Sequence, residues 1–116
     1  MPDPDRPKEC PDIVRYARLN QYHSLYHALR KNPLRVNDID PISLMTALHW
    51  ACANRSLKSV QEILEVDEVD LWVKDKFGRT AMDIALDSGN MEIIDLLFDL
   101  MHPEKDTSND LNEPDL

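Results

Sequence analysis

The sequence is poor in the residues that build many kinds of active site. Only two of its 116 residues are glycine, Gly78 and Gly89. A P-loop or a dinucleotide-binding turn needs several glycines close together, so both motifs are excluded. The two cysteines, Cys10 and Cys52, are too few for a disulfide framework and favour a reducing compartment. We therefore expect a cytoplasmic protein.

Long apolar runs and an excess of positive charge are also missing. No run of about 18 apolar residues occurs, so we expect no membrane-spanning helix. The N-terminal sequence MPDPDRPKECPD lacks the apolar region of a signal peptide. With 13 lysines and arginines against 22 acidic residues, the formal charge is −9. Because an acidic surface repels phosphate, nucleic acid is not expected as the main partner.

Composition divides the chain into three zones. Residues 1–11 hold four prolines and no aliphatic side chain except Met1, which predicts a flexible arm. Residues 102–116 hold five acids and one lysine. Pro103 is expected to end the preceding helix, and the remainder is expected to be a disordered acidic tail. The zone between them, residues 12–101, contains the periodic apolar residues that a folded domain requires.

Short helices are predicted throughout residues 12–101. Apolar residues recur there with the i, i+3, i+4, i+7 spacing of amphipathic helices, and polar or glycine-bearing turns separate the segments. These segments begin near Ile13, Leu25, Ala47, Leu57, Ala81 and Met91. Because no convincing strand pattern appears between them, the predicted fold class is all-α.

The middle of the chain repeats itself. The segment TALHWA at 46–51 returns 34 residues later as TAMDIA at 80–85. At the same offset, four apolar positions of one helix are matched by four in another: Leu57 by Met91, Val60 by Ile94, Ile63 by Leu97 and Leu64 by Phe98. A period in the low thirties with paired helices indicates a solenoid.

These repeats resemble ankyrin repeats over about 90 of the 116 residues. The family's opening D-x-x-G-x-T is found at 75–80, and its T-x-L-H-x-A signature at 46–51. The resemblance implies a short ankyrin-type solenoid of stacked helix pairs with β-turn fingers. A degenerate N-terminal cap is expected over 12–39, followed by repeats over 40–74 and 75–101.

The resemblance also implies structural roles for several polar residues. The ring of His49 is expected to hydrogen-bond across the base of a finger, and the hydroxyls of Thr46 and Thr80 to cap helices. Gly78 and Gly89 are expected to supply positive φ angles. Arg55 stands where the family usually has glycine, so we expect the neighbouring Asn54 to adopt the left-handed conformation at that turn.

No arrangement of residues indicates catalysis. His23 and His27 are four residues apart and could share one face of a helix, as two metal ligands do. No third ligand is evident nearby and no HExxH motif is present, so we interpret them as a solvated or packing pair. No nucleophile–base pair or carboxylate pair stands out either. We expect neither an enzyme nor a bound cofactor, metal or small-molecule substrate.

The remaining candidate site is the concave face of the solenoid, which the family uses to recognise partners. Exposed aromatic side chains beside arginine are typical anchors of protein interfaces. The alternative for Phe77 and Trp72 is that they only close the hairpin. Mapped from the resemblance, the expected partner-binding residues are Ile42, Met45, Asn54, Trp72, Lys76, Phe77, Arg79 and Asp87, with Ala53 and Ser88 beside them.

The favoured function is therefore a small module that binds another protein, as an adaptor or a regulatory inhibitor. The alternative is a nucleic-acid-associated regulator that uses the basic N-terminal half, since residues 12–60 hold seven basic and three acidic side chains. The last helix is apolar at eight of the eleven positions from 91 to 101. We assign Ile94, Leu97 and Phe98 to the seam with the preceding repeat. The others could pack on the inner helix, be covered by the tail, or support a weak homodimer.

Overall fold

A computed structural model of the chain describes residues 10–101. Within this range there are six α-helices, one 3-10 helix and no strand, which confirms the all-α prediction. The helices are α1 (Asp12–Arg18), α2 (Tyr22–Lys31), η1 (Pro33–Asn37), α3 (Ala47–Ala53), α4 (Leu57–Leu64), α5 (Ala81–Ser88) and α6 (Met91–Met101). The predicted tail and residues 1–9 of the predicted arm lie outside the described residues.

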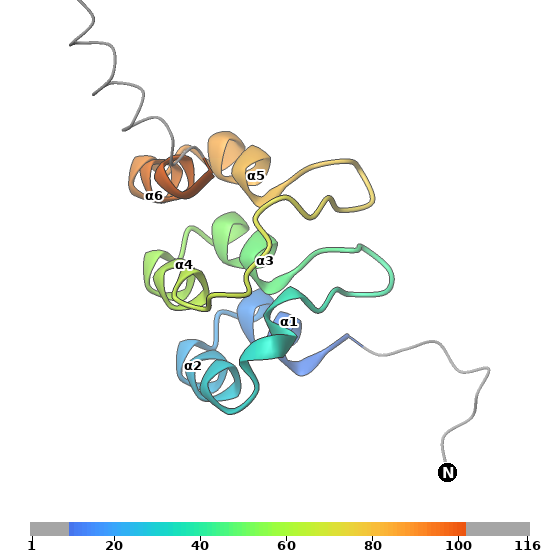
Figure 1. Ribbon diagram of the computed structural model, residues 1–116. Helices are drawn as coiled ribbons and strands as arrows, with labels where there is room; N and C mark the ends of the chain where they lie inside the picture. Colours follow the sequence, from blue (N-terminus) through green and yellow to red (C-terminus); the bar gives the residue numbers. More distant parts are fainter. Residues whose placement is uncertain (1–9, 102–116) are drawn as a thin grey trace, which may run out of the picture.

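The helices form three antiparallel pairs stacked in two rows (Figure 1). Helices α1, α3 and α5 make the inner row, and α2, α4 and α6 make the outer row. Two extended loops, which follow the first and second pairs, project from the side of the inner row as fingers. This arrangement confirms the ankyrin-type solenoid. We call the three helix pairs the first, second and third repeats.

Small residues allow the inner helices to approach one another. Ala47, Ala51, Ala81 and Ala85 are each at most 2% exposed, at positions where neighbouring inner helices meet. Larger aliphatic residues of the outer helices fill the space between the rows, and they include Leu25, Leu29, Val60, Ile63, Ile93 and Leu97. The core is therefore one continuous layer that runs the length of the stack.

Two threonines begin the inner helices, as predicted. The Thr46 hydroxyl accepts a hydrogen bond from the backbone N–H of His49 at 3.2 Å, and the His49 ring accepts one from the Thr46 backbone N–H at 3.2 Å. Thr80 and Asp83 make the same reciprocal pair at the start of α5. Each pair satisfies two backbone N–H groups that would otherwise lack an acceptor at the helix start.

The turn between the two helices of each repeat contains one left-handed residue. These residues are Asn20 (φ 59°), Arg55 (φ 58°) and Gly89 (φ 77°). The prediction for Asn54 is therefore wrong: Asn54 is right-handed, with φ −83°, and Arg55 itself adopts the left-handed conformation. The Asn54 amide donates hydrogen bonds to the carbonyls of Ala17 (2.8 Å) and Arg18, which fixes it at the end of α3.

The register of α6 also differs from the prediction. Ile93 and Leu97 are the fully buried residues of this helix, four apart on the face that packs against α4 and α5. Ile94 is only partly buried, and Phe98 is 39% exposed, so the assignment of Phe98 to the seam is wrong. The sequence comparison fixed the offset between repeats, but Ile93 replaces the buried Ser59 at its equivalent position, and a serine carries no apolar signal.

Candidate functional site

The two fingers lie side by side and are joined by a backbone hydrogen bond. The finger of the second repeat closes between Asp40 and Met45, and that of the third between Asp75 and Arg79. The Lys76 N–H donates to the Ser43 carbonyl at 2.9 Å. The tips of the two fingers therefore form one edge beside the inner helices, which we call the finger edge.

A buried carboxylate holds the finger of the third repeat in shape. Asp75 is 4% exposed and accepts hydrogen bonds from the backbone N–H groups of Phe77 and Arg79, both at 2.9 Å. The Arg79 Nε atom donates to the same carboxylate at 2.9 Å. Burial alone would raise the pKa of Asp75, but these donors and the positive charge of Arg79 outweigh it and lower the pKa. The carboxylate therefore stays ionised and keeps the loop closed.

Two apolar side chains project from this edge. Ile42 is 74% exposed and Phe77 is 71% exposed. Two cationic side chains lie near the Phe77 ring, one from the residue before it and one from two residues after it. Lys76 Nζ is 5.5 Å and Arg79 Cζ is 5.3 Å from the ring centroid. These cation–π contacts orient the ring while leaving most of it in solvent. The ring does not close the hairpin, because Asp75 and the backbone do so.

A hollow of about 560 Å³ lies next to the finger edge, between α3 and α5. Of the predicted site residues, Met45, Arg79 and Asp87 contribute to its lining. Trp72, Lys76 and Asp87 are exposed, and the backbone N–H of Trp72 donates to the Asp70 carboxylate at 2.9 Å. The complete lining consists of Met45, Trp50, Ala53, Arg55, Arg79, Ile84, Asp87 and Ser88.

Two predicted partner-binding residues are placed differently from expectation. Met45 is only 7% exposed, because it packs into the core at the base of its finger, so it does not present the exposed side chain expected of a partner-binding residue. Asn54 lies at the surface, but its amide is engaged with the carbonyl groups of Ala17 and Arg18 in the preceding repeat. It links two repeats, and its hydrogen-bonding donors are not presented to solvent.

Three residues that were not predicted for the site also line the hollow: Trp50, Arg55 and the buried Ile84. The indole Nε1 of Trp50 is buried, and no acceptor among residues 10–101 is within hydrogen-bonding distance of it. Arg55 takes part in none of the ion pairs formed within the described part of the chain. A comparison of the repeats could have pointed to Arg55, since the equivalent residue of the third repeat is Gly89.

His49 has the structural role implied by the resemblance. Its Nε2 lies 2.9 Å from the Arg79 carbonyl oxygen of the next repeat, and its Nδ1 lies 2.8 Å from the Thr46 hydroxyl. These partners assign the proton to Nε2. Burial lowers the pKa of His49, although the Arg79 carbonyl partly opposes this effect. The ring is therefore neutral and links two repeats through its hydrogen bonds.

Within residues 10–101, no group of three or more His, Cys, Asp or Glu side chains could hold a metal ion. His23 and His27 are both exposed. Burial raises the pKa of the Cys52 thiol to about 12, which makes it a poor nucleophile. No helix in this part of the chain has the length and apolar character needed to cross a membrane.

Comparisons with known proteins agree with this architecture. A family model described as ankyrin repeats (3 copies) matches residues 13–109. The NAD-dependent deacetylase sir2B of Dictyostelium discoideum is 28% identical over 95 residues, which cover 82% of this chain. The mitochondrial liver isoform of glutaminase from Mus musculus is 32% identical over 74 residues, or 62% of this chain. The aligned part is 12% of the length of each relative. The chain belongs to the ankyrin-repeat family.

Proposed function

We propose that this protein binds another protein through the finger edge and the adjoining hollow, and that it acts as an adaptor or a regulatory inhibitor. Ankyrin repeats generally mediate protein–protein interactions, and the family is typically non-enzymatic. The activities in the names of the two relatives belong to proteins of which this chain matches 12%. The repeats are therefore a sufficient explanation of those similarities.

The observation that carries the proposal is that Phe77 is exposed while the finger that holds it is fixed. Its ring is 71% exposed, yet the finger that holds it is fixed by three hydrogen bonds to Asp75. A side chain that is already ordered loses little conformational entropy when it binds, so more of its contact energy is available for affinity. Ile42 on the adjoining finger extends the apolar contact, and Lys76 and Arg79 supply a polar rim.

The proposed partner surface is an apolar pocket bordered by acidic groups. Phe77 requires a desolvated pocket, and the cations beside its ring favour carboxylates around that pocket. The basic N-terminal half gives less support to nucleic-acid binding. Three of its arginines are paired, Arg15 with Asp12, Arg30 with Glu62 and Arg35 with Asp38.

Affinity capture with the intact chain tests the proposal. The double variant Ile42→Ala/Phe77→Ala removes both exposed apolar side chains without touching Asp75. We expect it to lose at least about tenfold in partner binding, a hot-spot magnitude. The matched control is Leu34→Ala, because Leu34 is 75% exposed but belongs to η1 and to neither finger. Proteins that the wild type and both variants capture equally well would contradict the proposed surface.

Arg79 is a less clean target than Phe77. Its side chain is 44% exposed, but its guanidinium pairs with the buried carboxylate of Asp75 at 2.9 Å. Replacement by alanine would remove this partner from Asp75 and would be expected to loosen the finger as well as the interface. The Ile42/Phe77 pair is therefore the cleaner test of the proposed surface.

A further inference from the structure

The three left-handed turn residues define a common register for the repeats. Asn20, Arg55 and Gly89 occupy the same place in successive repeats, so residues 35 apart and then 34 apart are equivalent. A position that is buried in two repeats and exposed in a terminal one marks the surface that a neighbouring repeat covers. Comparison of equivalent positions therefore shows what each end of the stack leaves uncovered.

The C-terminal end exposes an apolar surface that the other repeats bury. On the inner row, Ala17 and Cys52 are equivalent and are 2% and 0% exposed. Their counterpart in the third repeat is Leu86, which is larger than either and 56% exposed. Among the three described repeats only the last exposes this position, so in the other two it faces the following repeat.

The outer row shows the same difference. Tyr22 is partly buried, and Lys58 Nζ of the second repeat lies 4.7 Å from its ring centroid. The equivalent Leu57 is partly buried against the core. Their counterpart in the third repeat, Met91, is 64% exposed. Leu86 and Met91 together make an uncovered apolar surface at the C-terminal end, which we call the end surface.

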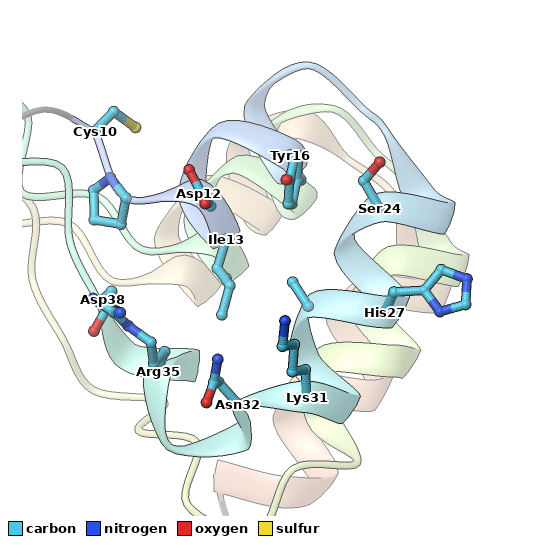
Figure 2. Close-up of a pocket in the computed structure, with 12 residues that line it drawn as sticks. Cys10, Asp12, Ile13, Tyr16, Ser24, His27, Lys31, Asn32, Arg35 and Asp38 are labelled. Carbon is cyan, nitrogen blue, oxygen red and sulfur yellow. Dashed lines mark hydrogen bonds and ion pairs between the residues drawn. The ribbon is translucent and has the colours of Figure 1, made fainter.

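The N-terminal end offers a groove at the complementary positions. Ile63 and Leu97 are fully buried where the second and third repeats meet their predecessors, and the equivalent Ala28 is only partly buried. A hollow of about 670 Å³ lies there between α1 and α2. Figure 2 shows this hollow, with Ile13 and Lys31 directed into it and His27 on its outer side. Residues that line this N-terminal groove include Ile13, Tyr16, Ser24, His27, Ala28 and Lys31.

The charges of the two ends are opposite. The first repeat, residues 10–39, holds five basic side chains and two acidic ones. Three of the five are paired with acids, and Arg18 and Lys31 take part in none of the ion pairs among the described residues. Helix α6 holds Glu92, Asp95 and Asp99 and no basic residue. If two copies met through α6 on both sides, like charges would oppose each other, which disfavours a symmetric contact. Contact between α6 and the first repeat of another copy would instead bring opposite charges together.

One ion pair inside the stack illustrates the match. Arg30 of α2 and Glu62 of α4 lie 3.3 Å apart across the boundary between the first and second repeats. In the common register the third repeat has Asp99 in place of Arg30, and the first repeat has His27 in place of Glu62. An acid and a histidine therefore occupy the positions that are equivalent to this pair at the two ends of the stack.

We infer that the end surface of one molecule docks into the N-terminal groove of a second copy of this chain, so that copies stack head to tail. Leu86 and Met91 would enter the groove beside Tyr16 and Ala28, as the second repeat meets the third within one molecule. Such a contact is heterologous and leaves one free end of each kind, so it propagates into open chains. The inference does not depend on the proposed function, and it leaves the finger edge of every copy accessible.

Two variants that each block one end test this inference. The end variant is Leu86→Lys/Met91→Lys, and the groove variant is Ser24→Glu/His27→Glu. All four replaced side chains are exposed, so folding should be unaffected. Each variant places charge opposite like charge on the other copy, positive against the first repeat and negative against α6, and should weaken self-association at least about tenfold. The control is Leu34→Glu, at a residue that is 75% exposed and lies outside both surfaces.

Sedimentation velocity between about 5 and 500 µM gives the readout. We expect the wild type and the Leu34→Glu control to form species larger than a dimer as concentration rises, and both end-blocked variants to stay monomeric. A 1:1 mixture of the two variants should form dimers and nothing larger, because only one intact end of each kind remains.

Three results would overturn the inference. If the wild type stays monomeric at about 500 µM, self-association in the measurable range is excluded. In that case, movement of the amide resonances of residues 102–116 in the end variant would identify the chain's own C-terminal segment as the cover. A groove variant that still dimerises would establish a symmetric contact instead. A mixture of the two variants that stays monomeric would show that the two surfaces do not meet.

Discussion

The ring of His49 in the second repeat donates a hydrogen bond from Nε2 to the Arg79 carbonyl of the third repeat at 2.9 Å. Arg79 also closes the finger that carries Phe77, through its backbone and its guanidinium. One buried ring therefore joins the cap of α3 to the base of the neighbouring finger. The position of the proposed binding edge depends on this contact between repeats.

Mild acid should destabilise the protein through His49. Burial lowers the folded-state pKa below the ordinary 6.5, so the unfolded chain binds a proton that the folded chain excludes. Stability is therefore fully present above about pH 6.5 and falls as the pH decreases from there towards the folded-state pKa. We expect the melting temperature of the wild type to fall between about pH 7 and 5.

The variant His49→Gln should show a weaker pH dependence over this range. It should also be less stable at pH 7 by about 1–3 kcal/mol, because the ring bonds to Thr46 and Arg79 are lost. His23→Gln is the control, since His23 is exposed and should keep the pH dependence of the wild type. An unchanged pH dependence in His49→Gln would assign the effect to other groups.

Arg55 and Gly89 occupy equivalent turns, and exchanging the residue type at each should change the stability in opposite directions. Arg55 pays the steric penalty of a left-handed residue with φ 58°, so Arg55→Gly should raise the free energy of unfolding by about 1 kcal/mol. Gly89 has φ 77°, and a Cβ there would meet no atom within 4 Å. Gly89→Ala should therefore lower the stability by a similar amount through backbone strain alone. Denaturant unfolding measures both, and two changes of the same sign would contradict the equivalence of the turns.

The indole N–H of Trp50 should make little contribution to stability. It is buried without an acceptor among residues 10–101, which costs about 1–3 kcal/mol relative to a satisfied donor. Trp50→Phe removes the donor and keeps an aromatic ring, so the free energy of unfolding should change by less than about 1 kcal/mol. Trp50→Ala is the comparison and should cost about 3 kcal/mol through lost packing. A Phe variant as unstable as the Ala variant would mean that the N–H is satisfied.

The two cysteines should differ in reactivity. Cys52 is fully buried with a pKa of about 12, whereas Cys10 is partly exposed, with burial raising its pKa to a smaller extent. A chromogenic thiol reagent should therefore titrate one thiol in the native protein and two in denaturant. Cys10→Ser should abolish the native reaction. Rapid modification of Cys52 in that variant would show that the inner helices open readily.

The fold could be predicted from the sequence because the residues that define each repeat act on backbone close to them in the chain. Thr46 and Thr80 cap the helices that follow them, and Gly89 is the left-handed residue after α5. A short sequence pattern is therefore enough to identify each of them. The positions that were predicted wrongly depend on the neighbouring repeat. Asn54 is right-handed because it reaches carbonyl groups 36 and 37 residues away, and Met45 is buried because the core continues under the finger.

The candidate site was predictable only in part, for a similar reason. Exposure of Ile42 and Phe77 follows from the position of each in its finger, and the structure places both at the surface. The rigidity of Phe77 depends on Asp75, whose bonds close within four residues of it, but no pattern in the sequence separates a buried aspartate from a solvated one. Trp50 was not predicted because the burial of its indole N–H depends on the residues around it in the fold, and no local sequence pattern reveals it.

The alanines of the inner row also affect how far apart the fingers lie. Ala51 and Ala85 are completely buried where neighbouring inner helices meet, whereas the outer row is spaced by larger residues such as Ile63 and Leu97. The small inner side chains thus allow neighbouring inner helices to lie close together, and with them the fingers that lead into these helices. Enlarging an inner alanine by one or two carbons would spread the fingers apart, so the shape of the binding surface can be altered at residues that no partner ever touches.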